Sequence, residues 1–158
     1  MDRSAILTQF LADIWSAGRV DKVSDYIAPR YTVHHDPGDP WDGKTLTRDG
    51  FCDRLVTSRA AAPDQVFVPR RMIAQADTVV VLWDGSGTHL GDLPGLPTTG
   101  RSITMSGMTM YDFDGVFLTG HWQIADRLSV WQQLAAWGQT IKTVLFPPFG
   151  GQSPNTPH

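Results

Sequence analysis

The hydrophobic period of this chain changes near residue 65, and this change constrains the fold more than any other feature. Before it, apolar residues such as Ile6, Phe10 and Ile14 recur at the three- and four-residue spacing of a helix face. After it, residues 66–74, 78–83, 101–111 and 116–125 have the pattern of strands. A last helical run begins near residue 127. Helices followed by consecutive strands and a final helix predict an α+β fold.

Turn-forming residues set the expected boundaries. A short strand is expected at residues 31–35, and Thr47 can cap a further helix. Asp114-Gly115 is a strong hairpin signal, whereas residues 84–100 hold five Gly and two Pro and predict a long connection. We expect a cone-shaped, curved, mostly antiparallel sheet packed with the N-terminal helices. One domain is expected over 1–158, with the cone at 1–141 and a Pro/Gly-rich C-terminal arm at 142–158.

Composition excludes several classes of function. The 158 residues carry 13 Lys and Arg against 16 acidic residues, all of them Asp, and no basic run suits nucleic acid. One cysteine, Cys52, rules out a disulfide framework within the chain. No apolar stretch is long enough to span a membrane and no signal peptide is apparent, so we expect a cytoplasmic protein. Six Trp and five Met suit a pocket for a flat apolar ligand.

Asp126 is the first candidate for acid–base chemistry. Strict alternation along the last strand puts Gly120, Trp122 and Asp126 on one largely apolar side, and His121 on the other. Desolvation at the end of such a face would raise the pKa of Asp126 and let it exchange a proton near neutral pH. Asp is also a preferred N-cap, and a helix is expected from residue 127, so both roles are open.

Further candidates follow from the same alternation. His35 shares a side with Tyr31, so we expect it to face the pocket and His34 to be exposed. His89 lies in the Gly-rich connection, which could form the pocket mouth. His35, His89 and Tyr31 could each donate a hydrogen bond to an oxyanion. His121 is expected to have a structural or interface role.

The expected pocket walls are aromatic or sulfur-containing side chains. They are Trp83, Met105, Met108 and Trp122, with Gly120 beside them. Met105 and Met108 have opposite parity, so a flat sheet cannot point both inward. Arg101 opens a strand and could pair with Asp84 or Asp92, contact an acidic substrate group, or remain solvated.

Metal and nucleotide sites lack sequence support. No His pair has helical i, i+4 spacing, and residues 34–36 cannot all converge from one regular strand, so no metal site is expected. The chain has neither a Gly-x-Ser-x-Gly nucleophile turn nor a Gly-x-Gly-x-x-Gly phosphate loop. These patterns therefore support neither a metal nor a dinucleotide cofactor.

An ordered set of short segments carries a family resemblance. They are Tyr31-Thr32-Val33-His34-His35-Asp36-Pro37, Ala62-Pro63-Asp64, Ile73-Ala74-Gln75-Ala76-Asp77, Gly87-Thr88-His89-Leu90-Gly91, Gly95-Leu96-Pro97-Thr98-Thr99-Gly100-Arg101, Gly107-Met108, His121-Trp122, Asp126 and Gln133-Leu134. Over roughly residues 5–135 this set resembles the SnoaL-like polyketide cyclases, within the nuclear transport factor two-like superfamily.

The resemblance implies a cone-shaped α+β barrel with a deep apolar pocket and no metal or organic cofactor. It also implies that Asp126 matches the acid–base Asp of an intramolecular aldol closure, typically on a polycyclic aromatic polyketide ester. Many relatives carry Glu where this chain has Gly120. That difference would remove a second carboxylate, open space beside Asp126 and favour a bulkier or differently placed substrate.

The predicted function is a cofactor-independent cyclase of a polyketide-like natural-product intermediate, acting by general acid–base catalysis. One alternative is an epoxide hydrolase or dehydratase on the same cone; in relatives, epoxide hydrolysis looks to need two Asp and an Arg around one water. The other alternative is a non-catalytic protein that binds a small hydrophobic molecule. The open sheet face and apolar arm predict a homodimer or homotetramer, with the arm crossing to a neighbouring subunit.

Overall fold

A computed structural model describes residues 1–135 of the chain, and the arm expected at 142–158 lies outside them. The first part contains α1 (Arg3–Phe10), a π-helical segment η1 (Leu11–Ser16), a short 3₁₀ turn η2 (Val20–Lys22) and α2 (Val23–Tyr26). Strands β1 (Ile27–His35) and β2 (Thr45–Thr47) precede α3 (Arg48–Arg59). Four long strands follow, β3 (Val66–Gln75), β4 (Thr78–Thr88), β5 (Ser102–Asp114) and β6 (Phe117–Ala125), and then α4 (Arg127–Leu134).

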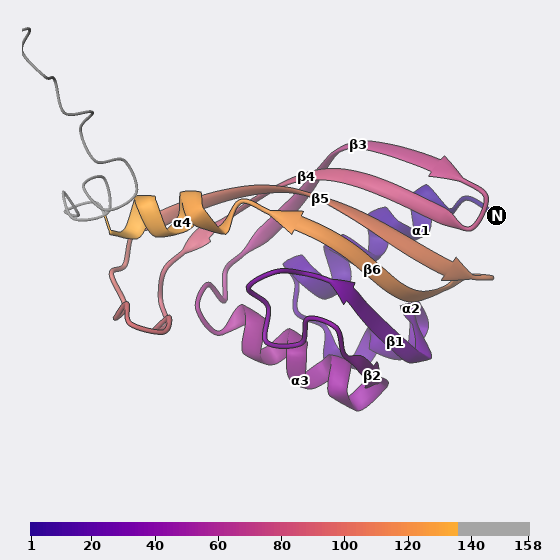
Figure 1. Cartoon of the computed structure of the whole chain (residues 1–158), viewed down its shortest axis with the longest axis horizontal. Helices are drawn as coiled ribbons and strands as arrows, with labels where there is room; N and C mark the ends of the chain where they lie inside the picture. The colour runs from indigo at the N-terminus through magenta and orange to yellow at the C-terminus, as the bar shows by residue number, and fades with distance from the viewer. Residues whose placement is uncertain (136–158) are drawn as a thin grey trace, which may run out of the picture.

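One curved six-stranded sheet organises the domain, in the order β2-β1-β6-β5-β4-β3. The pair β1–β6 is parallel and the other pairs are antiparallel. Figure 1 shows α1, α2 and α3 gathered on one face of the sheet, which we call the inner face, while α4 continues from the end of β6. This confirms the predicted α+β fold with its mostly antiparallel curved sheet. The sheet is open, however, with β2 and β3 at its edges.

Local sequence signals account for where these elements begin. Asp2 accepts hydrogen bonds from the amides of Ser4 and Ala5 at the start of α1. Thr47 caps α3 through the amide of Gly50, as predicted. Gly115 has φ +59° in the turn between β5 and β6, which explains the Asp-Gly hairpin signal. β4 extends to Thr88, five residues beyond its predicted end, because its Gly-rich part still pairs with β5.

The core fills the space between the inner face and the helices. Its largest members include Phe10 of α1, Tyr31 of β1 and Phe51 of α3. Tyr31 packs edge-on against Phe51 with ring centres 5.0 Å apart, and Phe10 lies tilted against Phe51 at 6.4 Å. The π-helical segment turns Trp15 toward Phe51. Arg59 of α3 donates to the freed carbonyl oxygens of Trp15 and Ser16. The end of this segment is therefore anchored by a side chain from another helix.

A bulge in β6 decides which side chains reach the core. Leu118 pairs with Phe113, but the next pair is Gly120 with Asp112, so Thr119 has no partner on β5. One extra residue reverses the facing of every later side chain. His121 is 2% exposed on the inner face, whereas Trp122 is 46% exposed on the outer face. The strict alternation predicted for this strand is therefore wrong beyond Thr119.

The first part of β5 is completed by a side chain. Pairing with β6 begins at Gly107, which leaves the backbone of Thr104 without a strand on that side. The Gln133 side chain accepts from the Thr104 amide at 2.9 Å and donates to the Thr104 carbonyl oxygen at 2.7 Å. The Asp126 amide donates to the carbonyl oxygen of Ser106 at 2.9 Å. These contacts hold α4 beside β5.

Across residues 1–135, the helices are too short or too polar to traverse a lipid bilayer.

Candidate active site

The Asp36 carboxylate, directly after β1, is the centre of a buried polar cluster on the inner face. It is fully buried and accepts hydrogen bonds from α3, β6 and α4. The donors are Arg54 at 3.1 Å, His121 at 3.4 Å, Gln123 at 3.1 and 3.2 Å, and Arg127 at 2.8 Å. A carboxylate offers about four lone-pair sites, so four donor groups saturate it. Asp36 is therefore held as an anion that orients its neighbours.

The charge of Asp36 is balanced inside the protein. Burial acts to raise its pKa, but the hydrogen bond from His121 and the charges of Arg127 and Arg54 outweigh it, so the pKa is lowered. Arg54 also donates to Asp39 at 3.0 Å, and its guanidinium lies 5.0 Å from the centre of the Trp15 ring. A buried charge is tolerated where it is paired and hydrogen-bonded in this way.

His121 connects Asp36 to Tyr31. Burial lowers the pKa of His121, although the hydrogen bond to Asp36 acts in the opposite direction, so the imidazole is neutral at pH 7. An ionised Asp36 accepts, which requires the proton on Nε2 of His121. Nδ1 is then the acceptor, and the Tyr31 hydroxyl donates to it at 2.7 Å. Burial and the neighbouring Tyr111 raise the pKa of Tyr31 well above its usual range, so Tyr31 keeps its proton.

A second chain of hydrogen bonds orients Gln123. Trp83 donates through Nε1 to the Thr109 hydroxyl at 2.8 Å, and that hydroxyl donates to Oε1 of Gln123 at 2.7 Å. With its oxygen engaged, Gln123 must direct its NH₂ group toward Asp36. The predicted wall residue Trp83 therefore contributes to the cluster through Thr109.

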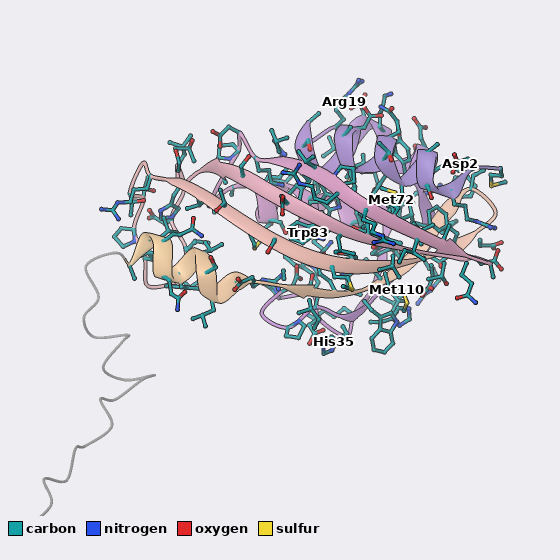
Figure 2. All side chains as sticks on the ribbon, turned by 90° about the horizontal axis from the view of Figure 1, so that it is seen from above. Asp2, Arg19, His35, Met72, Trp83 and Met110 are labelled. Atoms are coloured by element: carbon teal, nitrogen blue, oxygen red, sulfur yellow. The ribbon has the colours of Figure 1, made fainter. Side chains whose placement is uncertain are left out.

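Several predicted pocket residues lie elsewhere. Met105 packs against the core on the inner face, but Met108 is 51% exposed on the outer face, as their opposite parity requires. Trp122 stacks on His34 and His35, with ring centres 5.4 and 6.0 Å apart. Figure 2 shows His35 at the margin of the sheet, apart from Trp83. The exposed position of His34 is confirmed, while His35 is half-buried and outside the Asp36 cluster.

Gly120 and His89 have surroundings that differ from those predicted. Any side chain at Gly120 would lie 2.6 Å from the Thr32 carbonyl oxygen and 2.8 Å from the His34 ring. Gly120 therefore accommodates His34 and opens no space beside Asp126. His89 is fully buried in the β4–β5 connection, where its Nδ1 accepts from the Thr99 amide at 3.2 Å. Its contacts hold that connection together, away from Asp36.

Asp126 is exposed, so the burial predicted for it is wrong, while its capping role is confirmed. Its carboxylate accepts from the amide of Ser129 at 3.0 Å at the start of α4. It also borders an open groove of about 400 Å³ on the outer face, together with the ion pair Arg70–Asp84. Arg101 contacts the Gln133 carbonyl oxygen and not Asp126. A catalytic role for Asp126 stays a prediction.

Asp36, Arg54, Gln123 and Arg127 are not among the residues that the sequence predicts for the site. One signal was available: Arg54 lies on the same helical stripe as Phe51 and Leu55, and a charged residue on a buried stripe needs a buried partner. Arg127 and Gln123 gave no such signal, because the facing of β6 depends on the bulge. Within the described part, no group of three or more His, Cys or Asp side chains is placed to hold a metal ion.

An open curved sheet around N-terminal helices, with a polar cluster on the covered face, defines a domain of the nuclear transport factor two-like class. Residues 5–134 match the SnoaL-like polyketide cyclase family, and the chain belongs to this family. A structure from Acidithiobacillus ferrooxidans, provisionally assigned as a polyketide cyclase, is 52% identical with a TM-score of 0.82, covering 85% of this chain and 94% of that one.

More distant structures share the fold. IdmH from Streptomyces antibioticus, also provisionally assigned as a polyketide cyclase, is 22% identical with a TM-score of 0.73, covering 85% of this chain and 99% of its own. TsrD from Streptomyces laurentii is 20% identical with a TM-score of 0.70, covering 86% and 98%. No protein of curated function has significant sequence similarity to this chain.

Proposed function

We propose that this protein is a cofactor-independent cyclase that closes a ring in a polyketide-like intermediate by general acid–base catalysis. The observation that supports this best is the hydrogen-bonded chain Tyr31–His121–Asp36, in which a neutral imidazole lies against an ionised carboxylate away from water. An imidazole in this setting can take a proton, because the adjacent carboxylate stabilises the imidazolium that forms. Family membership favours a small-molecule substrate.

The proposed reaction is an intramolecular aldol closure. In this proposal, the substrate displaces the Tyr31 hydroxyl from Nδ1 of His121. Nδ1 then takes a proton from a carbon beside a carbonyl group, and the electron pair of the broken C–H bond forms an enolate. The enolate carbon attacks a second carbonyl of the same molecule, and the new alkoxide takes the proton from the imidazolium. The product is an isomer of the substrate. Acid–base catalysis of this kind contributes about 100- to 10,000-fold. In this proposal, the connection after Asp36 moves to admit the substrate while Asp36 stays against His121, because His121 is otherwise covered.

The rival acid–base group is Asp126, which borders the outer groove. Its exposure leaves it without the desolvation that such a role needs, so we favour His121. The test compares His121→Asn with Asp126→Asn, using a poly-β-carbonyl thioester and following ring closure by mass-resolved chromatography. We expect His121→Asn to lose at least 100-fold in rate and Asp126→Asn to stay within about threefold. The reverse order would assign the chemistry to Asp126.

One observation favours a second candidate, an epoxide hydrolase. Arg54 donates through one nitrogen to both Asp36 and Asp39, which places two Asp around one Arg. A cyclase adds no atom from water, whereas epoxide hydrolysis adds one oxygen. Turnover in H₂¹⁸O therefore separates the two, because a mass increase in the diol would support hydrolysis. Tight binding of both substrate classes without conversion would support the non-catalytic alternative.

We also propose that the protein forms a homo-oligomer through the outer face. The outer patch consists of Ile73, Val80, Leu82, Met108, Met110, Trp122 and Ile124. Cross-strand pairs make the patch continuous, because Ile73 pairs with Val80, Val80 with Met110, and Met110 with Trp122. A second row links Leu82, Met108 and Ile124. A broad sheet surface suits the same surface of a second copy, and contiguous exposed apolar patches commonly mark interaction sites.

The cytoplasmic location expected from the sequence stays a prediction.

A further inference from the structure

The four donors to Asp36 differ in how far they reach the solvent. The side chains of Arg54 and His121 are 4% and 3% exposed, but that of Arg127 is 31% exposed. Gln123 is half-buried. A ligand that approaches the Asp36 cluster from solvent therefore meets Arg127 and Gln123 before the other two donors.

Arg127 and Gln123 each have N–H groups that make no hydrogen bond within the Asp36 cluster. A guanidinium carries five N–H groups, and Arg127 uses two of them, toward Asp36 and the Pro37 carbonyl oxygen at 2.8 Å each. One N–H of Gln123 pointing between the carboxylate oxygens accounts for both of its contacts to Asp36. Within residues 1–135, the remaining N–H groups of these two side chains have no other acceptor at hydrogen-bonding distance.

The two donor groups converge and are held in place. Both contact Oδ1 of Asp36, so their nitrogen atoms are neighbours. The hydroxyl of Thr109 orients Gln123. The Arg127 side chain lies against Gly38, so close that a Cβ added at Gly38 would be 3.1 Å from Cδ of Arg127. Preorganised donors of this kind bind oxygen atoms that carry negative charge, because little orientation is lost on binding.

We propose that Arg127 and Gln123 form a binding site for one anionic oxygen of the ligand, either an enolate oxygen or a carboxylate. This inference rests on the proposed function for the enolate, which would be the first intermediate of the ring closure. The carboxylate is its stable counterpart. Asp36 then acts as a positioning residue that aims both donors.

The test compares two probes of matched shape, 2-naphthoate and neutral 2-naphthamide, by isothermal titration calorimetry with the full chain. We expect the wild-type protein to bind 2-naphthoate about tenfold more tightly. Arg127→Met should remove this preference without weakening 2-naphthamide, and Gln123→Leu should reduce it about threefold. Arg127→Lys keeps the charge and should retain part of the preference, which guards against an unfolded Arg127→Met.

Arg70→Met is the matched control, since Arg70 is the arginine of the outer groove. Its preference for 2-naphthoate should equal that of the wild type. Loss of the preference in Arg70→Met, its survival in Arg127→Met, or no wild-type binding of 2-naphthoate at millimolar concentration would each overturn the inference. Confirmed anion binding together with absent ring closure would reject the proposed function and leave this site standing.

Discussion

Oδ2 of Asp36 accepts a hydrogen bond from Nε2 of His121 at 3.4 Å, and both residues are almost completely buried. This contact joins the end of β1 to β6, which pair in parallel. A buried carboxylate destabilises the folded protein unless it is paired. Asp36 and His121 therefore contribute to the stability of the fold as well as to the proposed chemistry. Stability and activity of this protein should therefore respond together to changes at Asp36.

Asp36→Asn should strongly destabilise the fold. The substitution removes the negative charge and leaves the guanidinium of Arg54 buried with Asp39 as its remaining carboxylate. Breaking a buried pair of this kind costs about 3–5 kcal/mol. Urea unfolding followed by tryptophan fluorescence measures the change. Asp84→Asn is the control, because the ion pair Arg70–Asp84 is largely exposed and should contribute less than about 1 kcal/mol. Equal losses in the two variants would contradict the assignment.

Acid should destabilise the protein in two steps. Burial lowers the pKa of His121, so from about pH 6.5 downward the unfolded chain binds a proton that the folded protein does not. The pKa of Asp36 is also lowered despite its burial, so its contribution is lost below about pH 4. The free energy of unfolding should fall by up to about 1.4 kcal/mol per pH unit for each such proton.

His121→Gln tests the first of these steps. Urea unfolding at a series of pH values between 7 and 5 should give a shallower slope for His121→Gln than for the wild type. His34→Gln serves as the control, since His34 is exposed, and it should keep the wild-type slope. An unchanged slope in His121→Gln would mean that the pKa of this imidazole is the same in the folded and the unfolded chain, which would contradict the lowered pKa.

The sequence predicted the N-terminal helices, the four long strands and the final helix, because these follow from hydrophobic period and turn residues. It predicted neither β2 nor the start of β1 at Ile27. It could not predict the facing of β6, since one unpaired residue, Thr119, reverses it. That reversal moved His121 inward and Trp122 outward, and with them the whole candidate site. Pairing register depends on the partner strand, which local periodicity does not contain.

Asp126 illustrates a second limit. The sequence gives its capping role through the helix that follows, and the structure has that contact with Ser129. Its burial depended on the same face assignment as Trp122 and failed with it. Asp36 was passed over because it reads as a turn residue before Pro37, and its donors come from positions between 18 and 91 residues away. Sequence spacing carries no information on such contacts.

Gln133→Leu should loosen α4 from the sheet. The substitution removes both hydrogen bonds to the Thr104 backbone, each worth about 1 kcal/mol. The Thr104 amide should then exchange with deuterium faster, which nuclear magnetic resonance can follow. Gln132→Leu is the control, because Gln132 is exposed on the same helix. Unchanged protection of Thr104 in Gln133→Leu would mean that other contacts hold α4.

Gly120→Ala should destabilise the protein by about 1–3 kcal/mol, because the new methyl group would collide with the Thr32 carbonyl oxygen and the His34 ring. Thermal unfolding measures the loss. Gly120→Ala combined with His34→Ala should recover the part of the loss that arises from the ring and leave the part from the backbone. A neutral Gly120→Ala would restore the earlier expectation that this glycine leaves open space.

Charges on the outer patch should dissociate the proposed oligomer. Met108 and Ile124 are paired across β5 and β6 and are 51% and 62% exposed. Ile124→Lys places a charge at the centre of an interface from which water is excluded, so burial of that charge opposes association. Sedimentation velocity should give an assembly for the wild type and a monomer for Ile124→Lys. Val56→Lys is the matched control, since Val56 is 61% exposed on α3 and away from the patch. A monomeric wild type, or equal behaviour of the two variants, would reject the outer face as the interface.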